Sequence, residues 1–149
     1  MSHEEKAYQL FMGGCNCAQA VFTAFCDVTG MDEPTALKLS SSFGGGIGRM
    51  REVCGAVSAM AMVAGLVAGY SDGKDSNAKS EHYALVQRLA GQFREQNGTI
   101  ICRELLALPA GASAPQSAPR DKAFYERRPC AELVKSAARI LDEWLAQRT

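Results

Sequence analysis

The sequence has no net charge, because its 149 residues include 16 Lys and Arg and 16 Asp and Glu. Proteins that bind nucleic acid through its phosphates usually carry an excess of basic residues, so we expect no nucleic-acid partner. Charged residues make up only 21% of the chain and hydrophobic residues 47%, which is typical of a folded globular protein. The length suits one domain, and we expect residues 1–149 to form a single one.

Strongly apolar runs are also absent. Residues 53–71 contain no charged side chain, but more than half of them are Ala, Gly, Ser or Cys, which contribute little to membrane insertion. We therefore expect a buried helix there and no membrane partner. Residues 1–6 contain two acids where a signal peptide has basic residues, and no apolar stretch of signal-peptide length follows them. These features favour a cytoplasmic protein.

No part of the sequence shows the alternation of apolar and polar residues that is typical of a half-buried strand. Apolar residues instead recur at intervals of three and four, which predicts an all-α, single-domain helical bundle. The first expected helix ends at Gly13, the second runs from Asn16 to Gly30, and the third starts at 32–34 and ends by Phe43. Two more cover about 53–70 and 77–96, and the last two start at Cys102 and near Pro129.

Residues 53–70 have one bulky face and one face of small residues. Small side chains let a neighbouring helix approach closely, so we expect this segment to be the central helix of the bundle. Pro109–Pro119 is rich in Ala, Ser, Pro and Gly and is expected to be a loop or linker.

Six cysteines are present, and in the cytoplasm glutathione and thioredoxin keep thiols reduced. Several cysteines in such a protein indicate thiol chemistry or metal binding more often than permanent disulfides. Four of them fall in the first turn of an expected helix, namely Cys17, Cys54, Cys102 and Cys130. Unpaired backbone N–H groups at a helix start stabilise a thiolate, so we expect lowered pKa values at these positions.

A simpler interpretation is that each cysteine is only a small hydrophobic residue in the core. Four matching positions favour a functional site over this interpretation. Cys26 lies late in its expected helix and fits simple burial. Cys15 either joins the site or flanks it.

The glycine loop Gly44-Gly45-Gly46, followed by Arg49 and Arg51, precedes the expected central helix. It lacks the Gly-Lys-Ser/Thr of a P-loop and the full dinucleotide-binding fingerprint. It fits a tight turn, a segment that shapes or charges the cysteine site, or a cofactor-binding cradle in which backbone N–H groups and Arg49 hold an anion.

The order of these motifs resembles a known family. Along the chain stand Phe11-Met-Gly-Gly-Cys-Asn-Cys17-Ala-Gln-Ala-Val21, Phe43-Gly-Gly-Gly-Ile-Gly-Arg49, Val53-Cys54-Gly-Ala-Val57 and single cysteines at 102 and 130. This arrangement, over about 11–130, is similar to the redox-active protein family named for its C_GCAxxG_C_C pattern. The resemblance implies that the four cysteines named above are the family's cysteines, whereas Cys15 and Cys26 are extras. The sequence departs from the family pattern at Ala59, where a Gly is usual.

The resemblance also implies a helical fold similar to the split-Soret cytochromes, with a homodimer as a possible assembly. Covalent haem is not expected, because the attachment motif C-x-x-C-H is absent. The substrate and the redox partner stay open.

Three hypotheses for function remain. The first is a redox protein or oxidoreductase in which Cys17 and Cys54 form the central thiol pair and Cys102 and Cys130 a second or resolving pair. The second uses the same four cysteines as ligands of Zn or an iron–sulfur cluster, although no C-x2-C knuckle is present. The third is a non-catalytic helical module that dimerises through the small-residue face.

Overall fold

The computed structural model describes residues 1–148, and within that range it is all-α, with one isolated β-bridge between Val53 and Ile101. The helices are α1 (His3–Met12), α2 (Cys17–Ala24), α3 (Cys26–Thr29), α4 (Glu33–Ser40), α5 (Gly55–Ala68), α6 (Ser76–Asn97), α7 (Cys102–Leu105), α8 (Lys122–Arg127) and α9 (Cys130–Gln147). A short 3-10 helix, Ser41–Phe43, follows α4. The all-α class predicted from the apolar spacing is confirmed.

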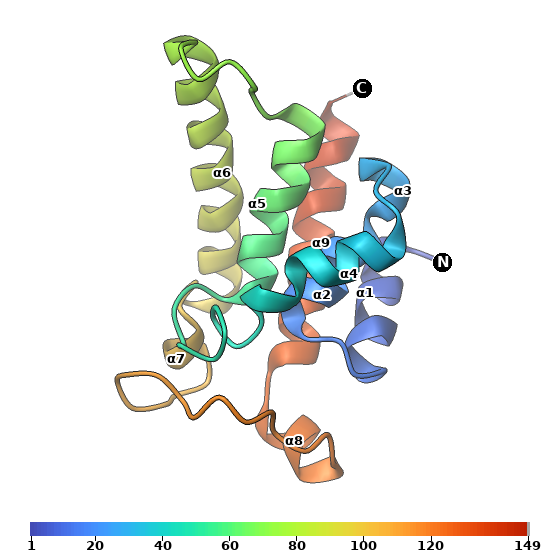
Figure 1. Cartoon of the computed structure of the whole chain (residues 1–149), viewed down its shortest axis with the longest axis vertical. Helices are drawn as coiled ribbons and strands as arrows, with labels where there is room; N and C mark the ends of the chain where they lie inside the picture. The colour runs from blue at the N-terminus through green and yellow to red at the C-terminus, as the bar shows by residue number, and fades with distance from the viewer. Residues whose placement is uncertain (149) are drawn as a thin grey trace.

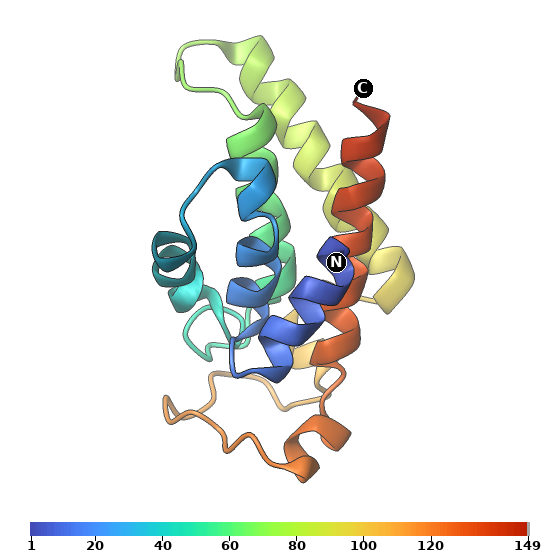
Figure 2. The same ribbon diagram turned by 90° about the vertical axis from the view of Figure 1, so that its right-hand side faces the viewer.

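The bundle is built around α5. Helix α5 packs against α2, α6 and α9, and α1 packs against α2 and α9. Figure 1 shows α5, α6 and α9 running side by side along the long axis, while α7, α8 and the segment between them lie at the lower end. The turned view in Figure 2 shows the same segment beneath the bundle. The N-terminal ends of α2, α5 and α9 therefore point to one end of the molecule.

Small residues allow α2 and α5 to come close together. Helix α2 lies in the middle of the bundle, and Ala18 and Ala20 are fully buried. A Cβ atom at Gly55 would lie 3.0 Å from the backbone nitrogen of Ala18, so only glycine fits there without displacement. Gly65, on the expected small-residue face, is exposed, and no atom would lie within 4 Å of its Cβ. That face is therefore not covered by a neighbouring helix at Gly65.

Two local expectations need correction. The helix expected from Asn16 to Gly30 is interrupted at Phe25, whose φ of −103° and ψ of 19° lie outside the helical range. Phe25 N–H bonds to the carbonyl of Phe22 three residues earlier, at 3.2 Å, and this tight turn separates α2 from α3.

Helix α8 was not expected from the sequence. Its N-terminus is capped by Asp121, whose carboxylate accepts the backbone N–H of Phe124 at 2.8 Å. The side chain of Phe124 is buried and anchors the helix. The cap was a usable local signal, but the six-residue helix is too short to show apolar periodicity.

No helix among residues 1–148 is both long enough and apolar enough to cross a membrane. The homodimer and the cytoplasmic location stay predictions.

Candidate functional site

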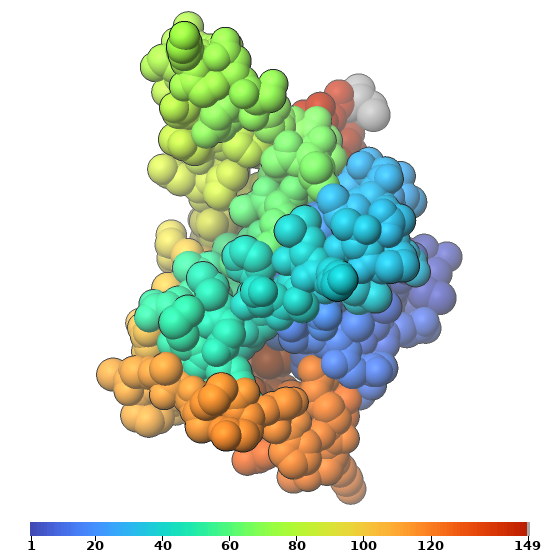
Figure 3. Space-filling view, in the orientation of Figure 1, coloured from blue at the N-terminus to red at the C-terminus, as the bar shows by residue number. Residues whose placement is uncertain are grey.

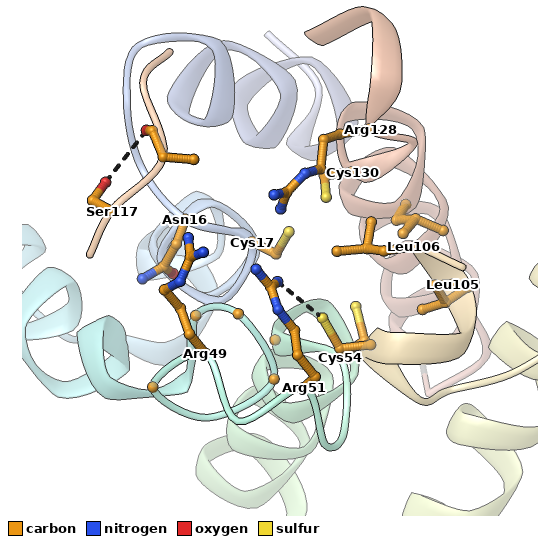
Figure 4. Close-up of a pocket in the computed structure, with 18 of the residues that line it drawn as sticks. Asn16, Cys17, Arg49, Arg51, Cys54, Leu105, Leu106, Ser117, Arg128 and Cys130 are labelled. Carbon is orange, nitrogen blue, oxygen red and sulfur yellow. Dashed lines mark hydrogen bonds between the residues drawn. The ribbon is translucent and has the colours of Figure 1, made fainter. Parts of the chain in front are cut away.

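The four cysteines that the sequence singled out meet at one cavity of about 290 Å³. Cys17, Cys102 and Cys130 are the first residues of α2, α7 and α9, and Cys54 is the N-cap of α5. All four line the cavity, and Figure 4 shows Cys17 and Cys130 turned toward each other. The placement at helix starts is as predicted, with Cys54 one position earlier than the first turn.

Local hydrogen bonds hold Cys54 beside Cys102. The backbone N–H of Cys54 donates to the carbonyl of Ile100 at 2.8 Å, and that of Cys102 donates to the carbonyl of Glu52 at 2.6 Å. These two bonds flank the bridge between Val53 and Ile101. Two chain segments far apart in sequence are thus paired so that both cysteines face the cavity.

Cys17 is fixed by the start of α2. The side chain of Asn16 accepts the N–H of Gln19 at 2.9 Å, and the side chain of Gln19 accepts the N–H of Asn16 at 3.0 Å. This capping box defines where the helix begins. The Asn16 amide also donates to the carbonyl of Ser41 at 3.1 Å and packs so tightly on Gly44 that a Cβ there would collide with it.

Cys17 is the centre of the thiol cluster. Interaction with the sulfur atoms of Cys130 and Cys54, together with burial, raises the pKa of Cys17 well above its usual range. The prediction of a lowered pKa for Cys17 is therefore wrong. Stabilisation by the helix start is outweighed because a proton on Cys17 is shared with two neighbouring sulfurs.

The pKa values of these two neighbours are shifted the other way. Interaction with Cys17 lowers the pKa of Cys54 against the effect of burial, with help from the backbone N–H of Ala56. The same thiol lowers the pKa of Cys130, and the positive charges of Arg128 and other arginines add to the effect. The prediction of a lowered pKa at Cys54 is consistent with this result.

Cys102 has a different environment. Burial raises the pKa of the Cys102 thiol, although the guanidinium of Arg51 acts in the opposite direction, so the lowered pKa expected for Cys102 is also wrong. An Arg51 N–H donates to the Cys102 sulfur at 3.5 Å, and a dashed line in Figure 4 marks this bond. Cys102 also lies close enough to Cys54 and Cys130 to feel their charge.

The glycine loop is wound in a left-handed sense beside the cysteines. Gly45, Gly46, Ile47, Gly48 and Arg49 all have φ between 53° and 67°. Each non-glycine residue in this conformation costs about 1–2 kcal/mol, and the three glycines reduce that cost. The turn is closed by hydrogen bonds such as the one from Glu52 N–H to the carbonyl of Gly46 at 2.9 Å.

The loop forms a wall of the cavity. Gly44, Gly45, Gly46 and Arg49, the cofactor-binding candidates from the sequence, all line it. A Cβ at Gly46 would lie 2.7 Å from the Cβ of Cys102, so the loop also shapes the cysteine site.

Four arginines line the cavity, and the sequence pointed only to those near the glycine loop. The four are Arg49, Arg51, Arg120 and Arg128. No aspartate or glutamate is among the described residues that line it. Sequence reasoning missed Arg120 and Arg128 because they follow the expected loop and no local pattern connects them with the cysteines.

Residues 113–120, which we call the strap, cover the cavity. Ser113 N–H donates to the carbonyl of Arg49 at 2.9 Å, and the Arg120 guanidinium donates to the carbonyl of Phe11 at 3.0 Å. Figure 3 shows the strap, in orange, lying across the lower end of the molecule. The segment expected to be a loop or linker is therefore part of the site.

The two remaining cysteines do not line the cavity. The backbone carbonyl of Cys15 accepts a hydrogen bond from Arg120 at 2.9 Å, so this residue flanks the site. Burial raises the pKa of Cys26, and the acidic side chain of Glu33 acts in the same direction. Cys26 fits the packing role expected for it.

The metal-ligand hypothesis finds no matching donor geometry. Among residues 1–148, no group of three or more His, Cys, Asp and Glu side chains is placed to hold a metal ion. The arginines around the thiols would also repel a cation. The role of the four cysteines as ligands of Zn or an iron–sulfur cluster stays a prediction.

Comparison with known proteins gives one match. A family model described as "Putative redox-active protein (C_GCAxxG_C_C)" matches residues 15–144. No curated protein matches, and no solved structure matches, so the likeness to split-Soret cytochromes stays a prediction.

Proposed function

The chain belongs to the C_GCAxxG_C_C family of redox-active proteins, and from this membership we propose that it carries out thiol–disulfide exchange with the cysteines of the cavity. One observation carries the proposal. Cys17, Cys54 and Cys130 line one cavity and interact with one another, and Cys17, whose pKa is raised, keeps its proton beside two sulfurs whose pKa values are lowered. Such a triad contains an attacking thiolate, a resolving thiol and an acceptor for its proton.

The first step is attack on a substrate disulfide. The Cys54 thiolate forms a bond to one substrate sulfur, the substrate S–S bond breaks, and the other half leaves as a thiolate. The product is a mixed disulfide between Cys54 and the substrate. The lowered pKa of Cys54 increases the fraction of its thiolate at a given pH.

The second step releases the rest of the substrate. Cys17 gives its proton to the Cys130 thiolate and attacks the Cys54 sulfur, which forms the Cys17–Cys54 disulfide and expels the second substrate thiolate. Two electrons pass from the two protein thiols to the substrate disulfide. The place of Cys17 and Cys130 in one cavity, where the two thiols interact, supports this proton transfer.

A second pair can then take over the disulfide. Once Cys130 has lost its proton again, it attacks Cys17 and releases the Cys54 thiolate, and Cys102 attacks Cys130 and releases Cys17. These exchanges move the disulfide to Cys102–Cys130 without changing the number of electrons. The shared cavity and the electrostatic interaction between Cys102 and Cys130 support this relay.

Disulfide mapping tests the proposal. The protein, reduced and handled without oxygen, is equilibrated in glutathione redox buffers, quenched with acid and mapped by mass spectrometry. We expect a Cys17–Cys54 disulfide as the oxidant is increased. Cys17→Ser removes this bond and leaves the helical circular dichroism intact, and Cys26→Ser, a cysteine outside the cavity, changes neither.

Two results would contradict this function. Unfolding of the Cys17→Ser protein in reductant would show that Cys17 serves packing. A disulfide pattern centred on Cys26 would show that the reactive thiol lies outside the cavity.

A further inference from the structure

The cavity contains more positive charge than its own residues can neutralise. Four guanidinium groups line it and no carboxylate among the described residues does. Arg51 is only 2% exposed, and its hydrogen bonds go to the hydroxyl of Ser113 at 2.8 Å and the sulfur of Cys102. Burial, followed by the charges of Arg51 and Arg128, lowers the pKa of Arg49. Burying a cation without an anionic partner is costly, so this arrangement requires an explanation.

Thiolates balance only part of this charge. Even if both Cys54 and Cys130 are ionised, two negative charges face four positive ones. Cys17 and Cys102 have raised pKa values and add no negative charge at neutral pH. The cavity therefore keeps an excess of positive charge in its reduced form.

We propose that the substrate of the thiols is a small anionic disulfide, whose carboxylate binds to Arg128 and Arg51 while its sulfur reaches Cys54 or Cys130. This proposal rests on the proposed function and adds the class of substrate. A carboxylate is a planar acceptor that pairs with the two N–H donors on one edge of a guanidinium.

Arg128 is the best placed anchor. Within residues 1–148 its guanidinium forms no hydrogen bond and no ion pair, and it stacks over the Phe124 ring at 4.9 Å from the centroid. Stacking fixes the plane of the guanidinium before a ligand arrives, and its N–H donors stay available. Figure 4 shows the nitrogen atoms of Arg128 and Arg51 on either side of Cys17.

The size and cover of the cavity favour a small molecule over a protein partner. The volume of about 290 Å³ suits a ligand of metabolite size. Cys54 and Cys130 are only 4% and 8% exposed, so a cysteine on another folded protein would have to enter beneath the strap. Figure 3 shows only a small opening between the strap and the rest of this face.

Two alkylating reagents of nearly equal size test the proposal. Iodoacetate and iodoacetamide both transfer a carbon to a thiolate with loss of iodide, but only iodoacetate carries a carboxylate. If the arginines merely stabilise thiolates, both reagents react faster with the cavity thiols than with Cys26, and to the same extent. If they bind an anion, the ratio of the iodoacetate rate to the iodoacetamide rate rises at the cavity thiols. Rates for each cysteine are followed by mass spectrometry on the reduced full-length protein.

We expect the rate ratio at Cys54 and Cys130 to exceed that at Cys26 by at least about tenfold, which corresponds to one charge-assisted hydrogen bond. Arg128→Gln should lower the ratio about tenfold at the cavity thiols. The matched control is Arg127→Gln, because Arg127 is exposed and does not line the cavity, and its ratio should stay within about twofold.

An equal ratio at all three cysteines, or a cavity in which neither reagent reacts, would overturn the anion site. An equal fall in the rate ratio in the Arg128→Gln and Arg127→Gln proteins would also overturn the role of Arg128. These outcomes are independent of the disulfide mapping, since a Cys17–Cys54 disulfide can form whether or not the ratio is raised.

Discussion

Replacing Gly46 with Ala tests how tightly the left-handed loop presses on the cysteine site. A Cβ at this position would lie 2.6 Å from the backbone nitrogen of Glu52, 2.7 Å from the Cβ of Cys102 and 2.9 Å from the carbonyl carbon of Arg51. Two of these atoms belong to the backbone and the third is fixed directly to it. No side-chain rotation can therefore relieve the overlap.

The cost has two parts. The left-handed φ of 67° at Gly46 costs an alanine about 1–2 kcal/mol. Relief of the overlap in a packed interior costs about 1–3 kcal/mol more. Gly46→Ala should therefore lower the free energy of unfolding by about 2–5 kcal/mol.

Gly48→Ala is the matched control. Its φ of 53° is also left-handed, but no atom would lie within 4 Å of its Cβ. It should lose only the conformational part, about 1–2 kcal/mol. Urea unfolding in reductant, followed by circular dichroism, measures the free energy of unfolding of both variants. We expect the slope of this free energy against urea concentration to be unchanged. An equal loss of stability in the two variants would refute the close approach of the loop to Cys102.

Three further predictions concern the thiols and the effect of metal removal. The rate of iodoacetamide alkylation should reach half its maximum at a lower pH for Cys130 than for Cys26. The reason is that Cys17 and the arginines lower the pKa of Cys130, whereas burial raises that of Cys26. A lower midpoint for Cys26 than for Cys130 would contradict the proposed electrostatics. The corresponding contribution of Cys130 to stability should be largest above about pH 8.5, the unfolded value, and should be lost as pH falls through the lowered folded value. Addition of EDTA should leave the midpoint of thermal unfolding unchanged, since no described group of donors is placed to hold a metal, and a fall in that midpoint would identify a structural metal ion.

The sequence predicted features that depend on local signals. Helix starts are set by nearby residues such as Asn16, so the positions of the cysteines beside them follow from the sequence alone. The glycine run likewise indicated an unusual turn before α5, and the loop is indeed left-handed.

Features that depend on contacts between distant segments were not predictable. The pKa direction of Cys17 is decided by Cys54 and Cys130, which belong to other helices. Arg128 reaches the cavity only because Phe124 anchors the short α8 and the chain then turns back into α9. A helix start by itself indicates a stabilised thiolate, and only the tertiary structure shows which sulfur keeps the proton.

The parallel course of α2, α5 and α9 gives this protein of zero net charge an electrical polarity. Each of these helices begins at the cysteine cavity, where the positive ends of their backbone dipoles meet the arginines. Helix α6 runs the opposite way and cancels only part of this moment. Zero net charge therefore does not mean that the molecule is electrostatically featureless. An anion diffusing toward this end of the molecule experiences an attractive field, which salt at 0.1 M largely screens at distances beyond about 10 Å.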